Sequence, residues 1–180
     1  FNLNPFAVTF FLFYQDARGY NFEGVDEAEI AQGSIPAMID LIKMKYGPYL
    51  HQVILTGDAM GKARNISEKD NASHYLQLQR GLGLSTHQIK VSSNPSHENS
   101  RSDVNDLLWQ TKQPNTRYFF SMNPDTMPNT CRDFRNVQCD ATGAIMKGNR
   151  KDLNQRGDFC DCGRYFLHLT ARPILLRLRR

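Results

Sequence analysis

The sequence predicts an α/β domain with a mixed sheet flanked by helices, and two observations support this fold class. Residues 6–14 and 20–30 are rich in β-branched and aromatic residues and are separated by a short turn, which is typical of an antiparallel hairpin. From residue 34 onward, segments with apolar residues at helical spacing alternate with short apolar runs. Because a hairpin precedes the alternating part, both antiparallel and parallel strands are expected in the sheet.

The first half of the chain is expected to continue with a helix and a short strand. Ser34 has the position of a helix N-cap, Pro36 lies in the first turn, and Gly47-Pro48 ends the helix. Residues 51–55 are a short apolar run that predicts a strand, and Thr56-Gly57-Asp58 follows at its carboxyl end. The apolar residues at helical spacing are Ile35, Met38, Ile39, Ile42 and Tyr46.

The second half is expected to alternate between helices and strands. The predicted helices cover residues 70–80, 96–111, 128–139 and 158–169, and the predicted strands cover residues 87–91 and 116–120. The predicted apolar side of the helix at 96–111 consists of Val104, Leu107, Leu108 and Thr111. The whole is expected to form one domain over residues 1–170, followed by a basic tail over residues 171–180.

Composition and charge exclude several classes of protein. A hydrophobic content of 40% with eleven Phe and seven Tyr is typical of a folded protein. No apolar run approaches the roughly 20 residues of a membrane helix. The net charge of +4 comes from the tail, which holds Arg172, Arg177, Arg179 and Arg180 and no acid. The rest of the chain is therefore neutral, and global charge indicates no partner.

A local excess of positive charge occurs between Lys147 and Arg156, where Arg150 and Lys151 are also basic and Asp152 is the sole acid. This segment could contact a phosphate backbone, or it could be a solvated basic loop. The four cysteines show no C-x-x-C pair, so free thiols are expected and a zinc site is disfavoured.

The stretch V-I-L-T-G-D-A-M-G-K-A-R-N at residues 53–65 admits two interpretations. A phosphate-binding loop needs four residues between its glycine and its Gly-Lys pair, followed by Ser or Thr. Here three residues separate Gly57 from Gly61, and Ala63 follows Lys62, so this interpretation fails. Asp58 lies instead at the carboxyl end of a predicted strand, where α/β proteins place binding sites. Two interpretations of Asp58 therefore remain: it is a metal ligand, or it only caps a turn.

Two further acids occur in the predicted helix at 158–169. A helical wheel places Phe159, Cys162, Phe166 and Leu169 in one apolar arc, with Asp158 and Asp161 at or just beyond its edge. Two acids beside an apolar face could bind a cation. They could also interact favourably with the dipole at the helix N-terminus.

The order of short motifs along the chain resembles the C-terminal nuclease domain of bacteriophage large terminase subunits, and the resemblance covers residues 1 to about 168. The motifs are F-N-L-N-P (1–5), T-G-D-A-M-G-K-A-R-N (56–65), N-P-S-H-E-N-S-R-S-D-V-N-D-L-L (94–108), N-T-C-R-D-F (129–134), D-A-T-G-A-I-M-K (140–147) and D-F-C-D-C-G-R-Y (158–165). The resemblance implies a ribonuclease-H-like fold. It also implies a metal-dependent endonuclease that cuts concatemeric double-stranded DNA with two Mg²⁺ or Mn²⁺ ions held by acids.

Residue by residue, the resemblance makes Asp58 and Asp161 the expected metal ligands and catalytic residues. Asp158 stands where relatives often have His, and as an oxygen ligand it remains a candidate for a hard cation. Arg101, Asp103 and Asn105 receive no role beyond capping and packing. The expected DNA-backbone contacts are Lys62, Arg64, Lys147, Arg150 and Lys151.

The resemblance also places an acid on a first strand that precedes F-N-L-N-P. Because the sequence begins with Phe1, that acid is expected upstream, the first strand is expected to be truncated, and the chain as written is expected to be a poor nuclease. Implied partners are an upstream packaging ATPase domain, a small terminase subunit and the capsid portal, in the cytoplasm of the bacterial host. The alternatives are another ribonuclease-H-like nuclease, of resolvase or transposase type, and a non-catalytic domain that grips DNA or docks on the portal.

Overall fold

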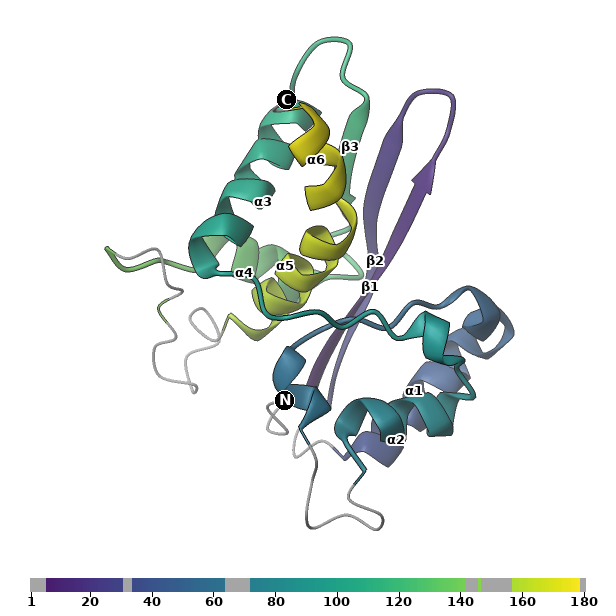
Figure 1. Cartoon of the computed structure of the whole chain (residues 1–180). Helices are drawn as coiled ribbons and strands as arrows, with labels where there is room; N and C mark the ends of the chain where they lie inside the picture. Colours follow the sequence, from purple (N-terminus) through teal and green to yellow (C-terminus); the bar gives the residue numbers. More distant parts are fainter. Residues whose placement is uncertain (1–5, 31–33, 64–71, 142–145, 147–156, 179–180) are drawn as a thin grey trace. The chain divides into compact units, whose positions relative to one another are not determined.

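Two compact units make up the chain, and each is described in turn. The computed structural model describes residues 6–30, 34–63, 72–141, 146 and 157–178. Unit 1 comprises residues 1–6 and 29–94, and unit 2 comprises residues 7–28 and 95–180 (Figure 1).

A three-stranded mixed sheet belongs to unit 2, except for the strand-end residues Phe6, Glu29 and Ile30. Strands β1 (Phe6–Gln15), β2 (Tyr20–Ile30) and β3 (Tyr118–Met122) are hydrogen-bonded in the order β1-β2-β3. A tight turn closed by the Asp16 N–H on the Gly19 carbonyl, at 2.9 Å, joins the first two as an antiparallel hairpin. β3 runs parallel to β2 in a register from Tyr20 opposite Tyr118 to Gly24 opposite Met122. The predicted mixed sheet is confirmed, with β3 two residues later than expected.

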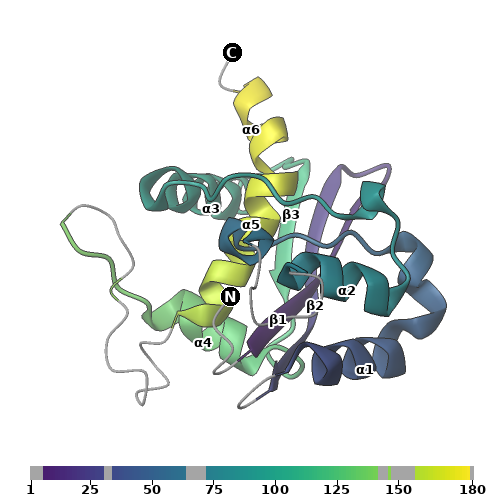
Figure 2. The same cartoon turned by 60° about the horizontal axis from the view of Figure 1, so that its bottom comes forward.

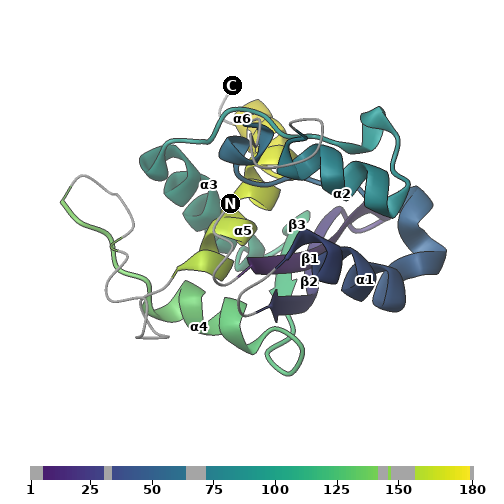
Figure 3. The ribbon, with the colours of Figure 1, turned by 90° about the horizontal axis from the view of Figure 1, so that it is seen from below.

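Helices α3 (His97–Thr111), α4 (Pro128–Asn136), α5 (Asp158–Thr170) and α6 (Arg172–Leu178) complete unit 2. α5 packs against the other three, and Figures 2 and 3 show it between them. The buried core of this unit consists of Phe22, Leu107, Phe120, Leu167, Ala171 and Leu175. α6 therefore lies within the residues expected as a basic tail and contributes a buried leucine. None of the helices that the structure describes is long and apolar enough to cross a membrane.

The buried faces of two helices differ from the predicted ones. α3 buries Ser100, Asp103 and Leu107, while Leu108 is 37% exposed. α5 buries four residues on one side, and neither Cys162 nor Phe166 is among them. The reason is that polar side chains on these faces bond one another inside unit 2, which the apolar periodicity alone does not reveal. The buried residues of α5 are Phe159, Gly163, Arg164 and Leu167.

Unit 1 is built on two helices that pack side by side, α1 (Ile35–Tyr46) and α2 (His74–Leu82) (Figure 1). Ser34 caps α1 as predicted, accepting the Ala37 N–H at 3.2 Å. The helices approach closely at Gly81, where an added Cβ would lie 2.3 Å from the Ile39 side chain. Gly83 ends α2 with φ +69°, a left-handed conformation that glycine adopts without strain.

The strands predicted at 51–55 and 87–91 are wrong. Between them only an isolated parallel bridge joins Leu55 to Ile89 in the described part of the chain. Short 3-10 helices take the first two residues of each predicted strand: η1 (Gly47–Gln52), with Pro48 in its first turn, and η4 (Thr86–Gln88). The Gln88 side-chain amide donates to the carbonyls of Leu50 and Val53, both at 2.8 Å. A side chain thus takes carbonyls that a longer strand pair would have used.

Gly163 is expected to be essential for the packing of α5. In a helix, replacement of glycine by alanine usually stabilises by about 0.5–1 kcal/mol. At Gly163, however, an added Cβ would lie 2.8 Å from two ring carbons of Phe134. We therefore expect Gly163→Ala to lower the free energy of unfolding by about 1–3 kcal/mol, measured by urea denaturation. Adding Phe134→Leu should recover part of this stability, and a stabilised Gly163→Ala protein would contradict the packing described.

Candidate metal centre

Asp58 lies at the start of a short 3-10 helix, η2 (Ala59–Lys62), in unit 1. Its carboxylate Oδ1 accepts the Met60 N–H at 2.9 Å, so Asp58 is the cap of this turn. Asn94 holds the same group from a distant part of the sequence. Its Nδ2 donates to Asp58 Oδ1 at 2.8 Å, and its Oδ1 accepts the Ala59 N–H at 2.7 Å. Asn94 therefore fixes both the carboxylate and the backbone that follows it.

The electrostatic setting of Asp58 favours the ionised form. Burial by itself acts to raise the pKa of this carboxyl group. The hydrogen bonds from the Asn94 amide and the Met60 N–H act in the other direction, and the pKa lies below its ordinary value of 3.8. Asp58 is thus an ionised carboxylate at neutral pH, as a metal ligand must be.

Lys62, predicted to contact DNA, is exposed and its ammonium group donates to the Val91 carbonyl. One of its three donor hydrogens is therefore used inside unit 1. Arg64, Lys147, Arg150 and Lys151 lie outside the described residues, and their role stays a prediction.

Asp158 and Asp161 both lie in the first turn of α5, in unit 2. A third acid, Asp133 on α4, supports this turn from outside: its Oδ2 accepts the Phe159 N–H at 3.0 Å and the Cys160 N–H at 3.3 Å. Asp133 is 1% exposed, and burial raises the pKa of its carboxyl group despite these bonds. It satisfies backbone N–H groups that a helix leaves without intrahelical partners.

Asp161 is paired with a cation of its own helix. Arg164, three residues further on, donates from one guanidinium nitrogen to Asp161 Oδ1. The guanidinium Nε donates to Ser100 Oγ on α3 at 2.8 Å. Asp161 lies in the first turn of α5, so the favourable interaction with the helix dipole suggested by the sequence applies to it. Asp161 also forms a specific ion pair with Arg164.

The donor set agrees in kind with a hard divalent cation, because Asp58, Asp158 and Asp161 offer only oxygen. The thiol of Cys160, next to Asp161 in the sequence, does not compete with these carboxylates for a metal ion. Burial, and after it the charge of Asp161, raises the pKa of Cys160 to about 12, so it is no thiolate at neutral pH. The cysteines at 131, 139, 160 and 162 form no disulfide bond.

Whether these acids join in one centre stays a prediction. Among the described residues, no group of three His, Cys, Asp or Glu side chains is arranged to hold a metal ion. Asp58 belongs to unit 1, whereas Asp158 and Asp161 belong to unit 2.

Sequence reasoning missed two residues that bond the predicted ligands, Asn94 and Arg164, and two that support them, Ser100 and Asp133. All four lie inside motifs quoted above, at 94–108, 129–134 and 158–165. The motifs therefore already contained these four residues. The spacing of apolar residues could not show which residue of one motif contacts which residue of another.

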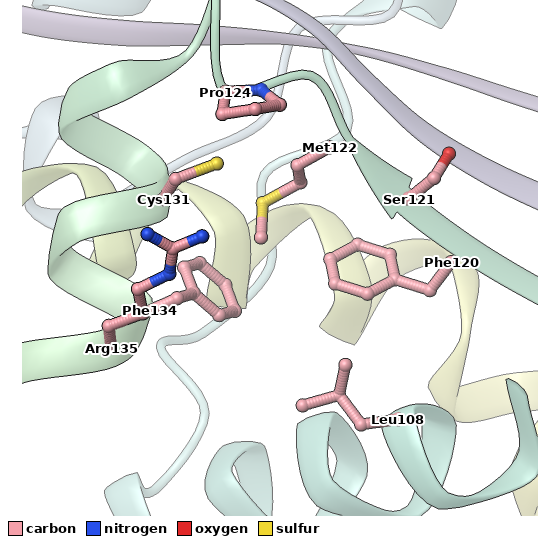
Figure 4. Close-up of a pocket in the computed structure, with 8 residues that line it drawn as sticks. All are labelled: Leu108, Phe120, Ser121, Met122, Pro124, Cys131, Phe134 and Arg135. Atoms are coloured by element: carbon pink, nitrogen blue, oxygen red, sulfur yellow. The ribbon is translucent and has the colours of Figure 1, made fainter. Parts of the chain in front are cut away.

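An apolar cavity of about 250 Å³ lies elsewhere in unit 2, between α3, β3 and α4 (Figure 4). Its lining includes Leu108, Phe120, Met122 and Phe134, with Arg135 as the charged member. No acid is among the described residues that line it, and these offer no carboxylate for a divalent cation.

Comparison with known proteins gave one similar structure. No protein-family model and no curated protein matches the chain. Among solved structures, the chain is similar to the nuclease domain of the g2p large terminase from bacteriophage SPP1, determined with bound Mn. The TM-score is 0.49 at 18% sequence identity, and the match covers 92% of this chain and 78% of that chain.

Replacing Asn94 by alanine is expected to raise the pKa of Asp58, because the ionised carboxylate then has one donor fewer. A carboxyl group with a depressed pKa stabilises the folded state above its unfolded pKa, and this contribution disappears as pH falls through the folded pKa. The stability difference between the wild-type chain and Asn94→Ala should therefore be larger at about pH 6 than at about pH 3.

Carbon-13 NMR titration of the Asp58 carboxyl and urea unfolding at both pH values measure this effect. Ser92→Ala, an exposed neighbour on the same segment, is the control. An Asp58 pKa that does not move in Asn94→Ala would contradict the role assigned to the amide.

Proposed function

We propose that the chain is the nuclease domain of a viral DNA-packaging terminase, which cuts concatemeric double-stranded DNA in a metal-dependent reaction. By resemblance, its partners are DNA, a packaging ATPase domain, a small terminase subunit and the capsid portal, in the cytoplasm of the bacterial host. The proposed cofactor is Mg²⁺ or Mn²⁺, with two ions in the complete site.

The observation that carries the proposal is that residues of separate motifs contact one another. Asn94 of the 94–108 motif holds Asp58 of the 56–65 motif. Ser100 of the same long motif bonds Arg164 of the 158–165 motif. Asp133 of the 129–134 motif caps that last motif as well. Motifs that resemble one family in their order along the chain are thus linked in space through their polar residues, as expected if they serve one function.

The proposed roles follow from the chemistry of phosphodiester hydrolysis. Bound divalent ions would activate water and neutralise charge on the leaving oxygen. Asp58 and Asp161 would hold them as ionised oxygen ligands, with Asp158 as a further candidate. Lys62, Arg64 and the segment 147–156 would hold the DNA backbone without reading its sequence.

Asp58→Asn and Asp161→Asn test the proposed catalytic role. Each should abolish Mn²⁺-dependent nicking of supercoiled plasmid, an effect beyond the roughly 10- to 100-fold that removal of an outer-shell partner costs. The midpoint of thermal unfolding should change little for Asp58→Asn, because asparagine is an equally good cap for the turn at η2.

The nicking assay should use this chain and a form extended upstream of Phe1 through the expected first strand. Asp125→Asn, which changes an exposed acid of unit 2, is the matched control and should cleave normally. Normal cleavage by Asp58→Asn in both forms would rule out the assignment. Tight DNA binding without any metal-dependent nicking would favour a non-catalytic domain that grips DNA.

The basic segment is expected to bind the phosphate backbone of DNA. Neutralising Lys147, Arg150 and Lys151 together should weaken DNA binding equally for all sequences. It should also flatten the dependence of log K on log salt concentration by about 0.9 for each phosphate that these side chains neutralise in the wild-type complex.

The matched control neutralises Lys43, Lys45 and Arg80 of unit 1, which changes the net charge by the same amount. Fluorescence anisotropy across a salt series measures both slopes. If the two triple variants give the same slope, the weaker binding reflects net charge alone and the segment makes no specific backbone contact.

A further inference from the structure

Arg164 is a cation enclosed within unit 2, with 5% of its surface exposed. Burying a guanidinium group is costly unless its charge is paired and its donors are satisfied. Named groups on two helices supply the pairing and part of the donor satisfaction: Asp161 of α5 is the countercharge for one terminal nitrogen, and Ser100 of α3 is an uncharged acceptor for Nε.

Ser100 is itself held in a fixed orientation. It is 2% exposed, and its hydroxyl donates back to a carbonyl of its own helix, with Ser96 at 3.0 Å and His97 at 3.1 Å within reach. Its proton is therefore directed at the backbone, and its lone pairs accept from Arg164 Nε. A continuous series of bonds thus runs from the α3 backbone through Ser100 and Arg164 to the Asp161 carboxylate.

We propose that Arg164, oriented by Ser100, is the positioning residue for Asp161, and this inference rests on the proposed function, in which Asp161 binds a divalent cation. The guanidinium holds Asp161 Oδ1 and thereby fixes the rotamer of the carboxylate. Hydrogen bonds to metal-ligating carboxylates from surrounding residues commonly have this effect, and they raise metal affinity by pre-orienting the ligand.

The alternative is that Arg164 competes with the metal and must move away from Asp161. Burial argues against it. A guanidinium that left Asp161 would remain enclosed and bonded to Ser100 without its countercharge, which is the costly state of a broken buried ion pair. Arg164 is therefore expected to stay in place and to share Asp161 with the metal.

The test is the affinity of the chain for Mn²⁺ alone, measured by the decrease of the electron paramagnetic resonance signal of free Mn²⁺. Ser100→Ala and Arg164→Met should each bind Mn²⁺ about 10-fold more weakly than the wild-type chain. Arg164→Lys keeps the charge but cannot bond both partners in the planar geometry of a guanidinium, so its affinity should be intermediate. Circular dichroism at the same temperature confirms that each variant is folded.

Ser102→Ala and Arg101→Lys, on the exposed side of α3, are the matched controls and should bind Mn²⁺ with the affinity of the wild-type chain. If Arg164→Met fails to fold, Ser100→Ala carries the test, because alanine is the strongest helix former. Unchanged or tighter Mn²⁺ binding by the folded variants would overturn the positioning role, and tighter binding would establish competition.

Asp161→Asn separates this inference from the function on which it rests. If Asp161→Asn loses Mn²⁺ binding while Ser100→Ala and Arg164→Met do not, the positioning role is wrong and the proposed function stands. If the wild-type chain and Asp161→Asn bind Mn²⁺ equally, Asp161 is no ligand and both fall.

Discussion

Buried charged groups that end or join helices are the constraint on which unit 2 depends. Helix N-termini leave N–H groups without intrahelical partners, and a buried terminus needs an acceptor from elsewhere. Asp133 supplies it for α5, and Glu27 on β2 does the same for α4 by accepting the N–H groups of Asn129 and Thr130 at 2.8 and 2.7 Å. The salt bridge between Asp103 and Arg172, at 2.8 Å, ties α3 to α6. Apolar packing surrounds these groups, but the charged contacts decide which helix ends meet.

The same constraint explains why acids occur where the candidate site is proposed. Asp133 is used for capping and is almost fully enclosed, so it is no candidate for a metal ligand. Asp161, by contrast, keeps 16% of its side-chain surface exposed while Arg164 orients it. Asp133 on α4 therefore caps the N-terminus of α5, whereas Asp161 in the first turn of α5 remains partly exposed and is the candidate ligand.

The elements with strong local signals could be predicted from the sequence, and the contacts between distant side chains could not. Ser34, Ser96 and Gly83 mark helix ends because caps are local interactions. The strand expected at 51–55 was wrong because His51 and Gln52 belong to a 3-10 helix and Gln88, more than thirty residues away, bonds the Val53 carbonyl. The candidate ligands Asp58 and Asp161 came from motifs, but their holders Asn94 and Arg164 required the fold. No helical period distinguishes a buried arginine with two partners from an exposed one.

The motif at 94–108 to which the sequence assigned no catalytic role connects the holders of both candidate ligands. Asn94, its first residue, fixes Asp58 within unit 1, and Ser100, six residues later, orients Arg164 and hence Asp161 within unit 2. The boundary between the units falls directly after Asn94. Pro95 and the N-cap Ser96 are the two residues between Asn94 and α3. Proline fixes its own φ and restricts the residue before it, so this connection is short and conformationally limited. Within each unit, a residue of this motif therefore contacts the candidate ligand or the arginine that is paired with it.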